Sequence, residues 1–252
     1  MMAIIGTELR KLLTIRSTYI ISGFLIVLTT LFSVYVFGYK HSAGLPVDTS
    51  YITQSIYAML SFTATFSAVV AILMVAHEYR YNMIIYTLTS VRNRLLVLAA
   101  KALVALLYAT VMAWIVIVIV YFGTYLGLSL ADKTIPAQQF DIVQLIPQWL
   151  VYIWGYAMFG FVIALIVRGL VGSIVVFFLW SSLEGILSLI LKESAKYLPF
   201  RALDATAATS IGTMPTSPNL PHNTAILVTL GYIALFLVIA GVLFVQRDAL
   251  KD

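Results

Sequence analysis

Residues 102–126, ALVALLYATVMAWIVIVIVYFGTYL, contain no charged side chain. A helix needs roughly 20 apolar residues to cross about 30 Å of hydrocarbon, because every backbone N–H and C=O must be bonded within the segment. This run is long enough, and it lacks the alternation of polar and apolar residues that marks a strand of a membrane barrel. It therefore predicts a membrane-spanning helix.

The rest of the chain has the same character. It is 62% hydrophobic and 10% charged, whereas a soluble domain needs about 25% charged residues to cover its surface. We therefore predict an all-α, polytopic membrane protein with six spans in a single domain over residues 1–252. Besides Ala102–Leu126, the predicted spans are Tyr19–Gly38, Ile56–Ala76, Trp149–Val167, Leu170–Leu191 and Ala225–Val245.

Residues 1–18 precede the first span and predict an amphipathic helix. Five apolar residues recur there close to the helical period of 3.6, and the charged residues fall elsewhere on the helical wheel. Such a helix lies in the plane of the membrane interface; the alternative is a soluble N-terminal arm. The apolar residues are Ile4, Ile5, Leu9, Leu12 and Leu13.

The distribution of lysine and arginine predicts the orientation. Ten of the fifteen lie on the side that holds both chain ends, the loop after the second span and the turn at Arg168. Cytoplasmic loops carry the excess of positive residues, so we expect both termini in the cytoplasm and the protein in the cell membrane. The formal charge of +5 is then an attraction to anionic lipid and does not indicate nucleic-acid binding. The ten are Arg10, Lys11, Arg16, Arg80, Arg92, Arg94, Lys101, Arg168, Arg247 and Lys251; the five are Lys40, Lys133, Lys192, Lys196 and Arg201.

Few residues suit catalysis or metal binding. The chain has no cysteine, its three histidines fall in different loops, and no GxxxxGK[ST] phosphate loop occurs. We therefore expect no metal site, no ATP site and no enzymatic activity in this chain. Residues 192–224, which hold four prolines, predict a partly ordered cap on the outer side.

Glu184 is the one carboxylate within a predicted span. An ionised group there costs about 3 kcal/mol on insertion scales, so it should face the bundle interior, a cavity or a partner. Ser181 and Ser182 are candidate hydrogen-bond partners. Two interpretations stay open, a residue of the transport pathway or a hydrogen-bonded carboxyl that holds helices together.

Residues 77–101, HEYRYNMIIYTLTSVRNRLLVLAAK, form a charged segment between the second and third spans. Two polar clusters flank a central part that is too apolar for a free loop and too short to cross the membrane. A short helix along the membrane surface satisfies both constraints, and Met83, Ile84 and Ile85 would fit a groove in another protein. The alternative is an amphipathic turn that rests on lipid.

This layout and segment resemble the ABC-2 type permeases, the membrane subunits of ATP-driven exporters. Those permeases commonly carry a Glu at the end of the second span, a short helix, a loop with Arg, and an Ala- and Lys-containing start to the third span. Glu78, Arg92, Arg94 and the run at 99–102 match that pattern, whereas the usual Gly-Thr and Pro of the family are absent here.

The resemblance implies that residues 77–101 form a coupling helix, which docks on a separate ATP-binding cassette subunit. ATP and Mg²⁺ would bind to that subunit, and two permease chains, identical or different, would form the substrate path. The implied partner-binding residues are Glu78, Arg80, Met83, Ile84, Ile85, Arg92 and Arg94. A stand-alone secondary transporter or channel, and a structural or sensor subunit, remain the alternatives. The aromatic-rich spans favour a hydrophobic or amphipathic cargo.

Overall fold

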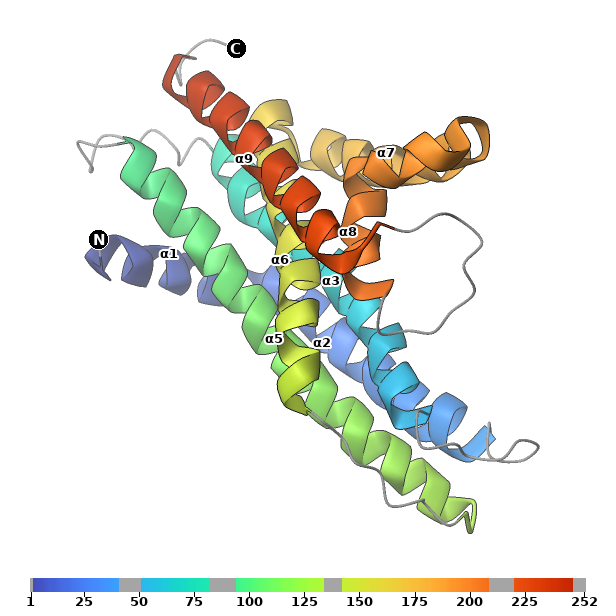
Figure 1. Cartoon of the computed structure of the whole chain (residues 1–252). Coiled ribbons are helices and arrows are strands. Elements are labelled where there is room, and N and C mark those ends of the chain that lie inside the picture. The colour runs from blue at the N-terminus through green and yellow to red at the C-terminus, as the bar shows by residue number, and fades with distance from the viewer. Residues whose placement is uncertain (1, 41–50, 82–93, 134–141, 209–219, 247–252) are drawn as a thin grey trace.

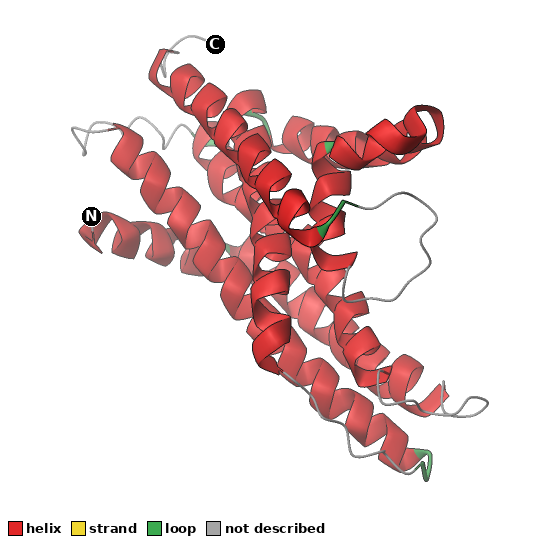
Figure 2. Ribbon diagram, viewed as in Figure 1, coloured by secondary structure: helices red, strands yellow, loops and turns green. Residues whose placement is uncertain are grey.

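The structure is a computed structural model that describes residues 2–40, 51–81, 94–133, 142–208 and 220–246. Within these ranges every regular element is a helix (Figure 2). The elements are α1 (Met2–Thr14), α2 (Arg16–Leu31), the π-helix η1 (Phe32–Lys40), α3 (Tyr51–Arg80), α5 (Arg94–Leu130), α6 (Ile142–Val167), α7 (Leu170–Leu191), the 3₁₀-helix η3 (Lys192–Tyr197), α8 (Pro199–Ala208) and α9 (His222–Gln246).

Six helical stretches are long and apolar enough to cross a membrane, which confirms the predicted all-α polytopic class. Each contains most or all of one predicted span, because the uncharged runs that fix span length also set where the helices lie. The six stretches are Arg16–Lys40, Tyr51–Arg80, Leu95–Leu130, Trp149–Val167, Leu170–Tyr197 and Asn223–Leu243.

The core of the bundle is the contact between α3 and α6. In each of these spans 67% of the residues of the most apolar window are buried, compared with 11% for the spans of α7 and α9. Figure 1 shows α6 in the middle of the molecule, with α5 on one side and α9 across its upper part. The outer helices therefore present most of their apolar surface outward, as helices that face lipid do.

Small residues allow the closest helix contacts. A Cβ added to Gly160 of α6 would lie 2.5 Å from the carbonyl oxygen of Ala68 on α3. One added to Gly127 of α5 would lie 2.6 Å from the Cα of Gly38 on η1. Glycine at these positions lets the two backbones touch, which is how membrane helices gain packing energy when lipid is as apolar as their side chains. Alanines at every fourth position of α5 also pack within the chain, since Ala105, Ala109 and Ala113 are all buried.

The N-terminal segment forms two helices that meet at Ile15. Ile15 has an extended backbone (φ −76°, ψ 117°), so α1 ends there and α2 starts in a new direction. Figure 1 shows α1 lying across the bundle beside the long helix α5. Leu9 and Leu13 are exposed on α1, whereas Leu12 is buried against the bundle. Exposed leucines on a crosswise helix fit a position in the membrane interface.

The structure describes residues 192–208 and 220–224 of the predicted outer cap. After η3 the chain turns back as α8, which packs beside α6 and α9 (Figure 1). Leu203 of α8 is fully buried, and a Cβ on Gly155 of α6 would lie 2.2 Å from its Cδ1 atom. Residues 199–208 therefore pack against the fourth predicted span.

Candidate functional site

Four charged side chains meet where α1 crosses the end of α3 and the start of α5. The Lys11 Nζ atom lies 2.8 Å from Glu8 Oε1 and 2.8 Å from Glu78 Oε1. The Lys101 Nζ atom lies 2.5 Å from Glu8 Oε2 and 2.6 Å from Glu78 Oε1. We call these four residues the charge cluster. Its two carboxylates and two ammonium groups balance, so it carries no net formal charge.

Three members of the charge cluster are almost fully buried. The side chains of Glu8, Glu78 and Lys101 are 2%, 4% and 4% exposed, and that of Lys11 is 37% exposed. Burial opposes a charged ammonium, but hydrogen bonds and charge attraction from Glu78 and Glu8 outweigh it, so the pKa of Lys11 is raised. Buried charges persist only when they are paired in this way.

The local sequence turns each of these side chains inward. Glu8 lies three residues after Ile5 and four before Leu12, on the face of α1 that packs on the bundle. Glu78 follows Met74 by one turn on the buried face of α3. Lys101 is placed in the same way on α5 between the buried Val97 and Val104. The charges therefore occupy positions that the helical period assigns to the core.

The charge cluster joins the two helices that border the 77–101 segment. Glu78 is near the last turn of α3 and Lys101 is in the second turn of α5, so their ion pair sets the distance between the two ends of the segment. Glu8 and Lys11 tie α1 to the same point. A displacement of the segment would therefore be passed to three helices at once.

The other predicted docking residues have different positions. Arg80 is exposed at the end of α3, and its guanidinium carbon lies 5.7 Å from the centre of the Tyr81 ring. Arg94 is the first residue of α5. Met83, Ile84, Ile85 and Arg92 lie outside the described residues.

The expectation that the charged residues of 1–18 lie away from the apolar face is wrong for Glu8, which is buried on that face. From the sequence, Lys101 is expected only as a cytoplasmic cation and as part of a family pattern. Both carry a readable signal, because a charge that falls on the apolar face of a helix must find a partner of opposite sign. Glu8 shares its helical face with Ile5 and Leu12, and Lys101 is surrounded by alanine and leucine. What the sequence lacks is the information that these two side chains and Glu78 meet.

Arg168 makes a second contact near the same end of α3. It links the turn between α6 and α7 to α9, because its Nη2 atom donates a hydrogen bond of 3.3 Å to the carbonyl oxygen of Leu243. Its guanidinium carbon also lies 5.2 Å from the ring centre of Tyr79 on α3. Arg168 has a positive φ of 58°, a conformation that costs energy for a non-glycine residue, so these contacts hold a tight turn.

Glu184 holds the start of α8. Its Oε2 atom accepts hydrogen bonds from the backbone N–H groups of Phe200, at 2.8 Å, and Arg201, at 3.2 Å. These are N–H groups of the first turn of α8, which have no partner within the helix, and an acidic side chain there is favoured by the helix dipole. Ser181 and Ser182, the partners expected from the sequence, make no hydrogen bond to Glu184 among the described residues, and Ser182 is exposed.

The described part of the chain offers no group of three or more His, Asp or Glu side chains that could hold a metal ion. The charge cluster contains two carboxylates, but two ammonium groups already occupy their oxygens. The charge cluster therefore holds α1, α3 and α5 together through its ion pairs.

A comparison with protein families covers most of this chain. A search of curated proteins found none that resembles this chain. A family model described as "Protein of unknown function (DUF2705)" matches residues 18–250, which cover the six spans and the charge cluster except for its two members in α1. The chain therefore belongs to the DUF2705 family.

Proposed function

We propose that this protein is the membrane-spanning permease subunit of an ATP-driven exporter. It would dock a separate ATP-binding cassette subunit through the 77–101 segment and form the substrate path with a second permease chain. Both termini would lie in the cytoplasm and the bundle in the cell membrane. ATP and Mg²⁺ would be bound by the partner subunit.

The observation that carries this proposal is the charge cluster. A segment that only connects two spans does not need its ends joined by buried ion pairs to a third helix. A segment that transmits force does, because a displacement at its centre must move the spans and not bend the connection. Lys101 supplies that stiffness through short contacts to both Glu78 and Glu8.

Coupling follows from differential contact. The ATPase subunits would close on ATP and bind one arrangement of the two permease chains more tightly than the other, and that difference is the free energy available to drive the change. Arg92 and Arg94 would position the coupling helix, and Met83, Ile84 and Ile85 would form its docking face. Glu78, which is buried, would hold the segment in place from within.

The test is purification of the tagged chain from native membranes, with identification of co-eluting proteins and an ATPase assay. The proposal predicts a stoichiometric ATP-binding cassette subunit and ATP hydrolysis that transport substrate stimulates. Reversing the charges at Arg92 and Arg94 should abolish co-purification or stimulation and leave the thermal stability of the chain unchanged. A chain that transports with both charges reversed, or without any ATPase, would instead be a stand-alone transporter.

A transport assay on the same preparation distinguishes a permease from a structural or sensor subunit. A structural or sensor subunit would co-purify with a partner but would transport no substrate across the membrane of sealed vesicles. The chain would then keep its charge cluster for assembly alone.

A further inference from the structure

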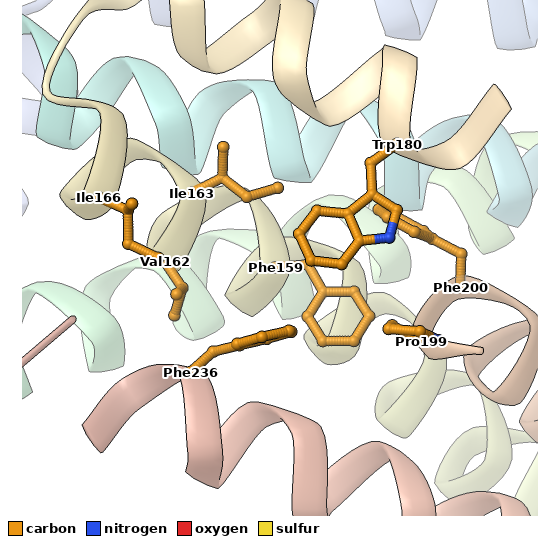
Figure 3. Close-up of a pocket in the computed structure, with 8 residues that line it drawn as sticks. All are labelled: Phe159, Val162, Ile163, Ile166, Trp180, Pro199, Phe200 and Phe236. Carbon is orange, nitrogen blue, oxygen red and sulfur yellow. The ribbon is translucent and has the colours of Figure 1, made fainter. Parts of the chain in front are cut away.

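A pocket with an entirely apolar lining lies between α6, α7, α8 and α9 (Figure 3). Its volume of about 30 Å³ exceeds the 10–15 Å³ or so that one water needs, but water also needs polar partners, which the lining lacks. The pocket therefore suits a slender hydrocarbon group. It is lined by Phe159, Val162, Ile163, Ile166, Trp180, Pro199, Phe200 and Phe236.

Aromatic rings from four helices enclose one end of this pocket. The ring centres of Trp180 and Phe236 are 5.6 Å apart, and those of Phe159 and Phe200 are 5.3 Å apart. Figure 3 shows Trp180, Phe159 and Phe236 gathered at this end, and the ring centres of Phe159 and Phe236 are 6.2 Å apart. The faces of such rings carry partial negative charge, so a cation beside them is attracted, with Trp the strongest of the three ring types.

A carboxyl group with spare capacity adjoins this aromatic end. Glu184 lies one helical turn after Trp180, and its Oε2 atom accepts the N–H of Phe200, so it is next to two residues of the pocket wall. Its Oε1 atom is buried and accepts no hydrogen bond of standard geometry among the described residues, and the Trp180 side chain lies close enough to stabilise the carboxylate. No described lysine, arginine or histidine side-chain nitrogen lies within 4.0 Å of the carboxylate.

A second acid lies one turn further along α8. The Asp204 Oδ1 atom accepts a hydrogen bond of 3.0 Å from the hydroxyl of Tyr156. The Tyr156 ring lies 5.6 Å from that of Phe200. Phe200 thus lies between two carboxyl groups, and neither is paired to a cation within ion-pair distance in the described part of the chain. The pocket therefore has an apolar interior and an acidic border.

We propose that this pocket takes the hydrocarbon part of a single-chain organic ammonium ion, whose positive head is balanced by Glu184. The Glu184 carboxylate supplies the negative charge that balances the ammonium ion, and the aromatic rings stabilise this cation further. The narrow apolar interior of the pocket accepts the hydrocarbon part of the ligand. An anionic amphiphile would be repelled by the carboxyl groups of Glu184 and Asp204. A neutral amphiphile would leave the negative charge of Glu184 without a positive partner. The statement that such ions are the exported substrate rests on the proposed function. Binding of the ion to the pocket does not, because it needs this chain alone.

The experiment measures binding of hexyltrimethylammonium to the purified chain in nanodiscs of zwitterionic phosphatidylcholine, by calorimetry. The neutral carbon isostere, in which a carbon replaces the ammonium nitrogen, is measured alongside. Glu184→Gln keeps an oxygen that can accept the N–H of Phe200 but removes the charge. It should weaken ammonium binding at least about tenfold and change binding of the isostere less than about twofold.

Two controls separate charge from folding. Glu193→Gln removes an exposed acid from the adjacent η3 and should alter neither ligand's affinity. Phe236→Leu should weaken both ligands, because it removes a ring from the wall. If Glu184→Gln lowers the thermal stability of the chain, a hexylammonium with a diazirine at the chain end should still label α6 and α9 of the unaltered protein.

Several results would overturn the inference. They are equal binding of the ammonium ion and its isostere to the unaltered chain, unchanged ammonium binding in Glu184→Gln, or photolabelling outside α6, α7, α8 and α9. Because no ATPase is present, such a result leaves the proposed export function standing. Conversely, a chain without an ATPase partner can still bind the ion.

Discussion

Replacing Lys101 with Met should destabilise the bundle more than any single surface change. Lys101 makes two short ion pairs, at 2.5 Å to Glu8 and 2.6 Å to Glu78, and its side chain is 4% exposed. Without it, both carboxylates share Lys11 alone, and the charge cluster carries one uncompensated negative charge. Removing one partner of a buried ion pair costs about 3–5 kcal/mol, so we expect a loss of that order.

The double variant Lys101→Met with Glu8→Gln isolates the cause. It restores charge balance, since Lys11 then faces the single carboxylate of Glu78. It should therefore recover more than half of the stability lost in the single variant, although it carries one more substitution. A recovery of this kind is a coupling energy between the two side chains, which lose additivity when they are in contact.

The assay is equilibrium unfolding of the purified chain in mild detergent, followed by circular dichroism as denaturant is added. Lys133→Met is the matched control, because Lys133 is exposed in the turn after α5, and it should change stability by less than about 0.5 kcal/mol. The reasoning is refuted if Lys101→Met is no less stable than Lys133→Met. It is also refuted if the double variant loses the full sum of its two single losses.

Two further predictions concern packing and pH. Gly160→Ala should lower the free energy of unfolding by about 1–3 kcal/mol, because the added Cβ would lie 2.5 Å from the Ala68 carbonyl oxygen. In the same unfolding assay the control Gly231→Ala should cause no measurable loss, because its Cβ would have no neighbour within 4 Å. Burial raises the pKa of Asp204 from 3.8 to about 6, so the folded chain holds a proton that the unfolded chain releases between these values. The contribution of Asp204 to stability should therefore fall by about 2–3 kcal/mol as pH rises from 4 to 6, and Asp204→Asn should make the loss of melting temperature over this range smaller; an unchanged slope would contradict the assignment.

The six spans were predictable because their signal is local. An uncharged run such as 102–126 must become a helix wherever it meets lipid, whatever its neighbours are. The same reasoning explains why α8 was not predicted. Ten residues that include Arg201 and Asp204 are too short and too polar to register as a span, and only the packing of Leu203 on Gly155 places them beside α6.

The candidate site was predictable in part. Glu78 stood out as an acid at the end of a span, and Glu184 as an acid within one. Their partners did not, because Lys101 lies 23 residues after Glu78, and the N–H groups that bind Glu184 lie 16 and 17 residues further along. Helical periodicity shows which face a residue occupies, but not which face of another helix it will meet.

Photo-crosslinking from the 77–101 segment tests the central claim most directly. A photoreactive residue at Ile84, on the predicted docking face, is compared in native membranes with one at the exposed Lys133. The account predicts an adduct with an ATP-binding cassette subunit from position 84 only, lost when Arg92 and Arg94 are reversed in charge. The absence of that adduct at equal expression, or the same adduct from both positions, would contradict it.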